Sequence, residues 1–314
     1  MRFSRWVLGP AVLALVAATA GCGGHEHATA GRPADKVYSA ASASAPGVVR
    51  VVAVGDIACE PGEAVTATTC RQADTASLAT RLRPDLVLTL GDHQYNANST
   101  AEFAGSYDKS WGALLPKTRP TIGNHEYVTP GAAGYYTYFK SRQPGPPGYY
   151  RVVAGGWNIW VLNSNCDKVS CRAEAAWLNR QMKAHPSRCS IVTMHHPRYS
   201  SGLEHGNNTA VKPLWNAAYR HRNDVVLSAH DHDYERFRPM DAKGHVKPRR
   251  GMVEFVAGTG GKNLYHLGTR KRGSVYYQAS TPGVLLLALH RGYVSWSYRA
   301  LSGAALDSGS RRCH

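Results

Sequence analysis

The sequence predicts an α/β fold. Apolar, β-branched segments with the length of buried strands alternate with segments that have the 3.6-residue period of helices. The first unit, a strand over 48–54, a helix over 71–82 and a strand over 86–90, is typical of a parallel crossover. In addition, five polar clusters each follow an apolar, strand-like run directly. This arrangement indicates one domain with a functional site at the ends of its strands.

The remaining elements follow along the chain. We expect further helices over 101–115, 172–184 and 210–220. In the second of these, Ala175, Leu178 and Met182 recur at i, i+3 and i+7 and form one apolar face. Further strands are expected over 119–122, 190–194, 225–228, 252–257, 284–289 and 293–298. Segments 149–153 and 158–162 are expected to form an antiparallel hairpin, preceded by a loop over 131–148 that is rich in Tyr, Gly and Pro.

The composition favours a folded protein with anionic partners. Hydrophobic residues make up 43% of the 314, which is enough for a sizeable core. The formal net charge of +16 favours phosphorylated substrates, wall polymers or anionic lipid surfaces. Lysine and arginine are scattered, without a basic helix or a stripe of stacking aromatics, so specific nucleic-acid binding is not expected.

Residues 1–21 have the features of a signal peptide. Arg2 and Arg5 precede a mostly apolar run that is shorter than the roughly 20 residues of a membrane span. Small residues then precede Cys22, as in a bacterial lipoprotein processing site, although Thr19 stands where Leu is usual. We therefore expect cleavage before Cys22 and lipidation of that cysteine. Ordinary secretion with cleavage nearby is the alternative.

After the signal peptide, the chain is expected to consist of a tether and one folded domain. Residues 22–47 are rich in Gly, Ala, Ser and Pro and are expected to be a flexible tether. Residues 48–314 are expected to form one folded domain. The protein is expected outside the cytoplasm, with membrane contact only through a lipid anchor at Cys22. The sequence does not predict an oligomeric state.

The cysteines agree with an oxidising compartment. Setting Cys22 aside leaves six of the seven, and six cysteines allow 15 pairings. Nearness in sequence suggests the pairs Cys59–Cys70 and Cys166–Cys171, which leaves Cys189–Cys313. Thiolate metal ligands are the rival interpretation, but no pair has the CxxC spacing.

The five polar clusters carry the residue types that bind metals. They are Gly55-Asp56, Gly91-Asp92-His93-Gln94-Tyr95, Gly123-Asn124-His125-Glu126, Val192-Thr193-Met194-His195 and the stretch 228–236, which contains His230 and His232. Carboxylates, an amide and imidazoles at one sheet edge form a cage for two metal ions, with Asp92 as the best candidate for a bridge. Two ions ~3.5–4 Å apart stabilise the attacking and leaving oxygens of an in-line displacement and activate water. Phosphoester hydrolysis needs both effects.

In order and spacing these clusters resemble the calcineurin-like metallophosphoesterases, and within them the purple acid phosphatase branch. Ala58 stands where most members have a metal-binding histidine, whereas Tyr95 stands where purple acid phosphatases have a tyrosine ligand. The resemblance implies a four-layer α-β-β-α sandwich with two mixed sheets and a dimetal site at the carboxyl ends of the strands. Plant members have an additional N-terminal β domain, and this chain has only the tether. Ala229 replaces the glycine that usually precedes the HxH motif, and we expect the loop to tolerate it.

The resemblance also implies a role for each matching residue. The first metal would be held by Asp56, Asp92, Tyr95 and His232. The second would be held by Asp92, Asn124, His195 and His230. A phenolate ligand suits ferric iron, so the implied cofactors are Fe at the Tyr95 site and Zn, Mn or Fe at the second. The residues implied at the substrate are His125 and His205 for catalysis, with His125, His196 and Arg198 for binding.

The function implied is that of a binuclear phosphoesterase. We expect a phosphomonoesterase, acid or alkaline, in which metal-bound hydroxide attacks the phosphorus of a phosphorylated small molecule or polymer. One alternative is a phosphodiesterase acting on nucleotides, lipids or wall polymers. A second is a non-catalytic, metal-stabilised surface binding protein.

Two other features are expected to lie outside the site. His93 is expected to point to solvent. The segment Gly258-Thr259-Gly260-Gly261 is expected to be a turn, with an anion-binding nest as the alternative.

Overall fold

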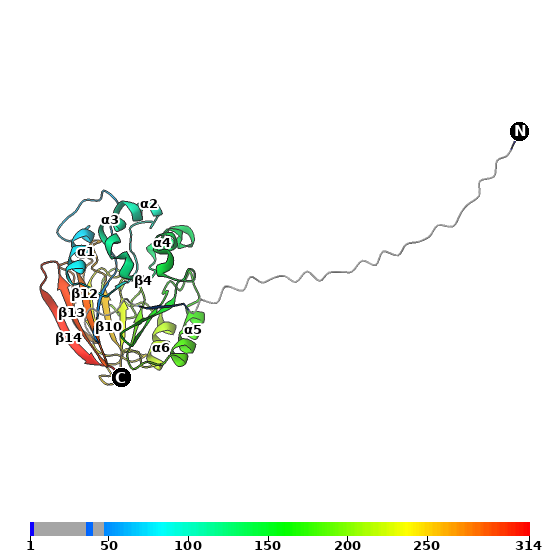
Figure 1. The fold of residues 1–314 in the computed structure, drawn as a ribbon. Coiled ribbons are helices and arrows are strands. Elements are labelled where there is room, and N and C mark those ends of the chain that lie inside the picture. Colours follow the sequence, from blue (N-terminus) through cyan, green and yellow to red (C-terminus); the bar gives the residue numbers. More distant parts are fainter. Residues whose placement is uncertain (3–35, 40–46) are drawn as a thin grey trace. The chain divides into compact units, whose positions relative to one another are not determined.

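The computed structural model describes residues 1–2, 36–39 and 47–314. The predicted signal peptide beyond its first two residues, the predicted lipidation site Cys22 and most of the predicted tether lie outside the described residues. The helices and strands of the described residues belong to the unit Pro33–His314. Two mixed sheets pack face to face in this unit and helices cover their outer faces (Figure 1), so the predicted fold class is confirmed.

The first sheet has eight strands in the order β1-β5-β6-β7-β8-β10-β9-β11. The strands are β1 (Val37–Ser39), β5 (Tyr150–Ala154), β6 (Trp157–Val161), β7 (Ser190–Thr193), β8 (Val225–Ser228), β9 (Tyr234–Phe237), β10 (Val253–Ala257) and β11 (Ser274–Gln278). The central strands β6, β7, β8 and β10 run parallel. They are mostly apolar and are buried on both faces, as parallel strands between two layers must be.

The second sheet has six strands in the order β14-β13-β12-β2-β3-β4. The strands are β2 (Val49–Val54), β3 (Leu86–Thr89), β4 (Thr118–Pro120), β12 (Gly283–His290), β13 (Tyr293–Ala300) and β14 (Ala305–Arg312). The first three of these are parallel to one another, and the last three form an antiparallel meander. The carboxyl ends of the parallel strands β2, β3 and β4 therefore lie together at one end of the sheet.

The helices form the two outer layers. They are α1 (Gln72–Arg81), α2 (Thr100–Glu102), α3 (Asp108–Trp111), α4 (Ala133–Phe139), α5 (Cys171–Ala184) and α6 (Lys212–Arg220). One core lies between the sheets, a second joins α5 and α6 to the first sheet, and a third joins α1, α3 and α4 to the second sheet. Three apolar layers thus hold four structural layers together.

Several elements differ from the sequence prediction. The helix expected over 101–115 is broken by a π-helical turn, Phe103–Tyr107, and ends in a 3₁₀ turn, Gly112–Lys117, that contains a proline. The loop expected over 131–148 contains α4, because Tyr135 and Phe139 are spaced at i, i+4 and both are buried. Within the expected tether, β1 pairs in parallel with β5, and the ring of Tyr38 packs against that of Tyr150.

The three predicted disulfides are confirmed: Cys59–Cys70, Cys166–Cys171 and Cys189–Cys313. The last joins the loop before β7 of the first sheet to the end of β14 of the second sheet. It therefore ties the two sheets together at the end where their parallel strands begin. Within the part of the chain that the structure describes, no helix has the length and apolarity needed to cross a membrane.

Candidate metal centre

Five strands bring the predicted metal-binding residues to one end of the sandwich. Asp56 follows β2, Asp92 follows β3, and Asn124 lies in the loop after β4, while His195 and His230 follow β7 and β8. The loops after β2 and β3 continue side by side past the sheet, since the amides of residues 56–58 donate to the carbonyls of residues 91–93. The same geometry that pairs the strands thus also sets the spacing of the side chains that follow them.

Three of these residues have a left-handed backbone. The φ angles of Asp56, Asp92 and His230 are +58°, +48° and +72°. Residues other than glycine rarely adopt such angles, and each costs about 1–3 kcal/mol. All three lie at the end of the fold where the predicted ligands meet, so part of the strain of this backbone is located at the candidate site.

The first predicted ligand group is assembled around the phenol oxygen of Tyr95. This oxygen lies 2.9 Å from Oδ1 of Asp56, 3.2 Å from Oδ2 of Asp92 and 3.0 Å from Nε2 of His232. Nε2 of His232 is also 3.5 Å from Oδ1 of Asp56. All four side chains are buried. A single phenol proton cannot satisfy three acceptors. The cluster therefore brings several oxygen and nitrogen lone pairs close together, as a cation site does.

The second predicted group is assembled around Nε2 of His195. This nitrogen lies 3.2 Å from Oδ2 of Asp92, 3.0 Å from Oδ1 of Asn124 and 3.2 Å from Nδ1 of His230. The ligand atoms of Asp92, His195 and His230 all lie within 4.8 Å of one another. Asn124 and His230 are partly exposed, so this side of the cluster faces solvent.

Asp92 belongs to both groups through the same oxygen, Oδ2. Burial would raise the pKa of its carboxyl, but the charge and hydrogen bond of His195, together with the charges of His125 and His230, hold that pKa well below its usual range. Conversely, burial would lower the pKa of His195, and Asp92 raises it to about 9. The carboxylate therefore remains negative and attracts positive charge, as a ligand between two cations must.

The remaining groups have protonation states that suit metal binding. Burial and the charge of His195 lower the pKa of His230, so its imidazole is neutral. Burial and the charges of Asp56 and Asp92 raise the pKa of the Tyr95 phenol well above its usual value. A phenolate therefore forms at Tyr95 only where a cation compensates its charge.

Backbone carbonyls fix the orientation of two imidazoles. Nδ1 of His195 donates to the carbonyl of Leu90 at 2.8 Å, and Nδ1 of His232 donates to that of Asn263 at 2.6 Å. Since a carbonyl only accepts, each ring carries a proton on Nδ1, and Nε2 is the nitrogen that faces the cluster and can bind a metal ion in place of a proton. Metal-binding histidines are held in this way. The seven side chains therefore fit the binuclear metal site that the resemblance implies.

His125 lies at the solvent side of the cluster. Its amide donates to Oδ1 of Asp92 at 2.9 Å, and its Nδ1 donates to the carbonyl of Asn96 at 2.8 Å. Its ring packs on Tyr95 with the centroids 4.3 Å apart, and its Nε2 is 4.0 Å from Oδ2 of Asp92. The side chain is 28% exposed, so the ring lies between the cluster and solvent.

The structure brings two of the three other predicted substrate residues to the cluster. The exposed ring of His205 stacks on His230 with the centroids 4.0 Å apart. His196 also lies beside His230, at 4.4 Å, but it is buried and bonds Ser164 through Nδ1. Arg198 is placed differently. Its guanidinium lies over the ring of Tyr199 and donates to the carbonyl of Asn208, and both of these lie outside the cluster.

Sequence reasoning missed the loop that follows β10. Besides the carbonyl of Asn263, this loop supplies Tyr265, whose ring stacks on His232 with centroids 3.8 Å apart. It also supplies Lys262, whose Nζ lies 5.3 Å from the centre of the Tyr95 ring and pairs with Glu63 at 2.8 Å. No motif identifies these residues, because their roles depend on a loop conformation rather than on a strand end.

The glycine-rich start of the same loop, residues 258–261, packs on the loop after β2, which carries Asp56. The amides of Gly258 and Gly260 donate to the carbonyls of Asp233 and Gly55. These two amides are therefore occupied, which favours the expected turn over an anion-binding nest.

His93 was predicted to point to solvent, and this prediction is wrong. Its side chain is fully buried, with Nδ1 2.8 Å from Oε1 of Glu126 and Nε2 2.7 Å from Oγ1 of Thr89. Glu126 also accepts the amides of Asp92, His93 and Gly123, at 3.1, 2.8 and 2.6 Å. This buried carboxyl joins the loop after β3 to the loop after β4. Through Glu126, His93 helps to hold Asp92 in place, and it is not part of the surface.

Ala229 fits in the HxH loop as expected. It is fully buried, and its amide donates to the carbonyl of His195 at 2.9 Å. A Cβ on Gly55 would lie 2.5 Å from the Cβ of Ala229. The space for the alanine methyl group is thus provided by the glycine opposite.

The chain is similar to phosphoesterases in sequence and fold. The profile of the family described as "Calcineurin-like phosphoesterase" matches residues 49–234, which include all seven predicted ligands. Purple acid phosphatase 23 of Arabidopsis thaliana is 26% identical over 218 residues, covering 57% of this chain and 47% of the plant protein. The chain thus matches about half the length of this curated relative.

Solved structures share the fold. That of purple acid phosphatase PPD1 from yellow lupin (Lupinus luteus) seeds has a TM-score of 0.71 at 16% identity, covering 87% of this chain and 55% of that chain. GAP50, described as the anchor in the inner membrane complex of Plasmodium, has a TM-score of 0.65 at 13% identity, covering 85% and 90%. PhoD has a TM-score of 0.59 at 11% identity, covering 87% and 70%.

A glycine substitution tests how closely the cluster is packed. Gly91 has a φ of +95°, and a Cβ there would lie 2.6 Å from Nδ1 of His195. Gly131 also has a positive φ, +63°, but a Cβ there would meet nothing within 4 Å. We expect Gly91→Ala to lower the free energy of unfolding by about 2 kcal/mol more than Gly131→Ala, and to weaken metal binding. Equal effects in chemical denaturation and metal titration would contradict the close packing.

Proposed function

The chain belongs to the calcineurin-like phosphoesterase family, and we propose that it is a binuclear metal-dependent phosphatase that hydrolyses phosphate monoesters. The proposal assigns the first ion to Asp56, Asp92, Tyr95 and His232. It assigns the second ion to Asp92, Asn124, His195 and His230.

The observation that carries the proposal is the position of Asp92. Its Oδ2 lies within 3.2 Å of both the Tyr95 phenol oxygen and Nε2 of His195, the central atoms of the two ligand groups. A carboxylate shared in this way would hold two cations close together and offset their repulsion. Two such ions, when bound, lower the pKa of a water molecule and neutralise charge on a phosphoryl group.

His125 is the residue we assign to proton transfer. Its Nδ1 is committed to the carbonyl of Asn96, so Nε2 is the atom that can gain or lose a proton. When water adds to phosphorus and the bond to the leaving oxygen breaks, Nε2 donates its proton to that oxygen. His205 and His196, which contact the ring of His230, are assigned to the binding of phosphoryl oxygens. The contacts of Arg198 give no support for its predicted phosphate clamp.

An aromatic and a cationic side chain beside the cluster suggest where the rest of the substrate lies. Tyr265 is partly exposed beside His232 and His205, and Lys262 lies over Tyr95. We assign these two side chains to the leaving group of a phosphorylated small molecule or polymer. A phosphodiester has a second substituent that must also be accommodated, and no contact described above provides for it.

We also propose that the protein acts outside the cytoplasm. Its three disulfides support this location, because disulfides persist in oxidising compartments. Processing before Cys22, with lipid attached to that cysteine, remains our prediction from the sequence for how the protein is retained at the membrane.

Removal of one second-site ligand tests the proposed chemistry. We expect His230→Ala to reduce the hydrolysis of an aryl phosphate about 10³-fold or more, because one ion loses a ligand. The bound metal per chain, measured by elemental analysis, should fall as well. The matched control is His245→Ala, which removes an exposed histidine from the loop before β10 and should leave both values unchanged.

Two outcomes would contradict the proposal. Undiminished turnover by purified His230→Ala protein would remove this residue from the site. A wild-type protein that binds two ions but hydrolyses neither an aryl monophosphate nor a bis-aryl phosphate would instead be a metal-stabilised binding protein. Faster turnover of the diester would favour the phosphodiesterase alternative.

The identity of the first ion is tested by colour. A ferric ion bound to the Tyr95 phenolate gives a charge-transfer band in the visible spectrum. We propose Fe at this position and Zn, Mn or Fe at the second. Freshly purified protein should therefore absorb in the visible range, and Tyr95→Phe should lose the band. Colourless protein that contains Zn or Mn, or a coloured Tyr95→Phe variant, would rule out the iron–tyrosinate assignment.

A further inference from the structure

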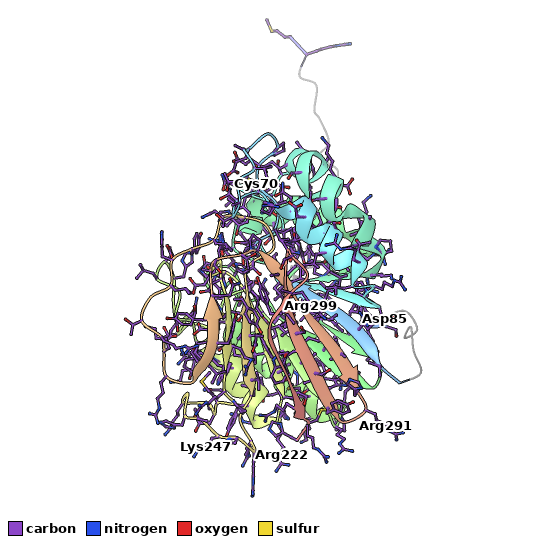
Figure 2. All side chains as sticks on the ribbon, turned by 90° about the vertical axis from the view of Figure 1, so that its left-hand side faces the viewer. Cys70, Asp85, Arg222, Lys247, Arg291 and Arg299 are labelled. Atoms are coloured by element: carbon purple, nitrogen blue, oxygen red, sulfur yellow. A yellow bond between two sulfur atoms is a disulfide. The ribbon has the colours of Figure 1, made fainter. Side chains whose placement is uncertain are left out.

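The end of the sandwich opposite the metal centre carries many exposed positive charges. The parallel strands begin at this end, so the loops before β7, β8 and β10, the turn between β12 and β13, and the end of β14 all lie here. Their exposed lysines and arginines, which we call the basic face, are Lys183, Arg188, Arg220, Arg222, Lys243, Lys247, Arg249, Arg250, Arg291 and Arg312. Figure 2 shows Lys247, Arg222 and Arg291 along one end of the domain and Cys70 toward the other.

Contacts between these loops show that they form one surface. The disulfide Cys189–Cys313 joins the loop before β7 to the end of β14. Arg311 donates to the carbonyl of Gly251 in the loop before β10, at 2.7 Å. Trp157, at the turn between β5 and β6, donates to the carbonyl of His290 at 2.9 Å. The charges therefore belong to a fixed face rather than to independent loops.

No acidic side chain on these loops compensates the basic face. The two acids there, Asp224 and Asp241, are buried and half-buried respectively, and both accept backbone amides. The arginine and lysine ion pairs of the described residues are made by Arg71, Lys168, Arg236 and Lys262, and none of these belongs to the face. Exposed acids lie elsewhere, at Glu60, Glu63, Asp74, Asp108, Asp167 and Glu204.

The face also has features that suit a lipid surface. Tyr293 is 40% exposed beside Arg291, and its ring stacks on His290 at 4.0 Å. Tyrosine is favoured at membrane–water interfaces because one end of its ring is apolar and the other polar. Between Arg188 and Arg291 lies a cavity of about 500 Å³, which has room for a phosphate-bearing headgroup.

We propose that the basic face binds the surface of a membrane rich in anionic lipids. Ten exposed cations on one face suit the plane of negative charges that anionic headgroups present. Bound in this way, the domain would present its metal centre away from the bilayer. Under the proposed function, the enzyme would then act on substrates in the surrounding solution rather than on lipids of the same membrane.

The experiment measures binding of the full-length protein to vesicles. We expect tighter binding to phosphatidylcholine vesicles that contain about one third phosphatidylglycerol than to phosphatidylcholine alone. An apolar N-terminal segment or lipid would bind both, so the difference reports the charge. Because the attraction acts within a Debye length, about 8 Å at 0.15 M salt, the difference should disappear as the salt is raised.

Charge reversal locates the binding surface. Each cation near an anionic bilayer contributes about a fivefold factor in affinity. The triple variant Lys247→Glu, Arg249→Glu, Arg250→Glu should therefore lose at least tenfold in affinity for the anionic vesicles. The matched control, Lys109→Glu, Arg172→Glu, Lys212→Glu, makes the same change in net charge on exposed residues of α3 and at the starts of α5 and α6, which follow the carboxyl ends of β6 and β7, and should lose much less. Both variants should unfold at the wild-type temperature and hydrolyse aryl phosphate at the wild-type rate.

Three results would overturn the proposal. One is equal affinity for the two kinds of vesicle, and another is an equal loss in both triple variants, which would indicate net charge alone. The third is tighter binding to soluble linear polyphosphate than to anionic vesicles at equal phosphate concentration. That result would assign the basic face to a polymer. A wild-type protein without phosphatase activity would contradict the proposed function, but it would leave the membrane binding of the basic face unaffected.

Discussion

The carboxylate of Asp92 is the constraint on which the rest of the site depends. It is buried, its backbone is left-handed, and its Oδ2 lies between the Tyr95 phenol and the His195 imidazole. Placing a negative charge there is unfavourable unless opposite charges and hydrogen bonds surround it. The fold provides those through the amide of His125 and the charge of His195. The geometry of the two ligand groups follows from this one residue.

Buried acidic side chains accept hydrogen bonds from the loops that helices and strands do not hold in place. Glu126 accepts three amides beneath Asp92. Glu254 on β10 accepts the amides of Arg198 and Tyr199, and Glu235 on β9 accepts that of Ser201, so the segment leading to His205 is fixed from below. Glu254 is fully buried, and this burial raises its pKa to about 8. These hydrogen bonds therefore hold the loops, and the histidines that they carry, in fixed positions.

The sequence was sufficient for residues whose position depends on a strand end. Asp56, His195 and His230 each follow an apolar strand, and parallel strands bring their carboxyl ends together. Sequence reasoning failed where tertiary packing decides. His93 looked like a surface residue but is enclosed by Tyr107, Tyr135 and Phe139. The polar edge strand β14 and the Tyr265 loop have no periodic pattern, because contacts with distant residues determine their conformation.

Charge divides the domain into two ends with different chemistry. At one end, acids and histidines converge on a cluster that attracts cations, and at the other, uncompensated arginines and lysines attract anions. Both ends are products of the same parallel strands, since the metal centre occupies their carboxyl ends and the basic face their amino ends.

The most direct test of the account is a crystal structure of the metal-loaded protein with anomalous scattering recorded at the absorption edges of its metals. We predict two ions ~3.5–4 Å apart, with Asp92 bound to both, Tyr95 bound to one and His195 bound to the other. A single ion, or two ions that do not share Asp92, would contradict the account.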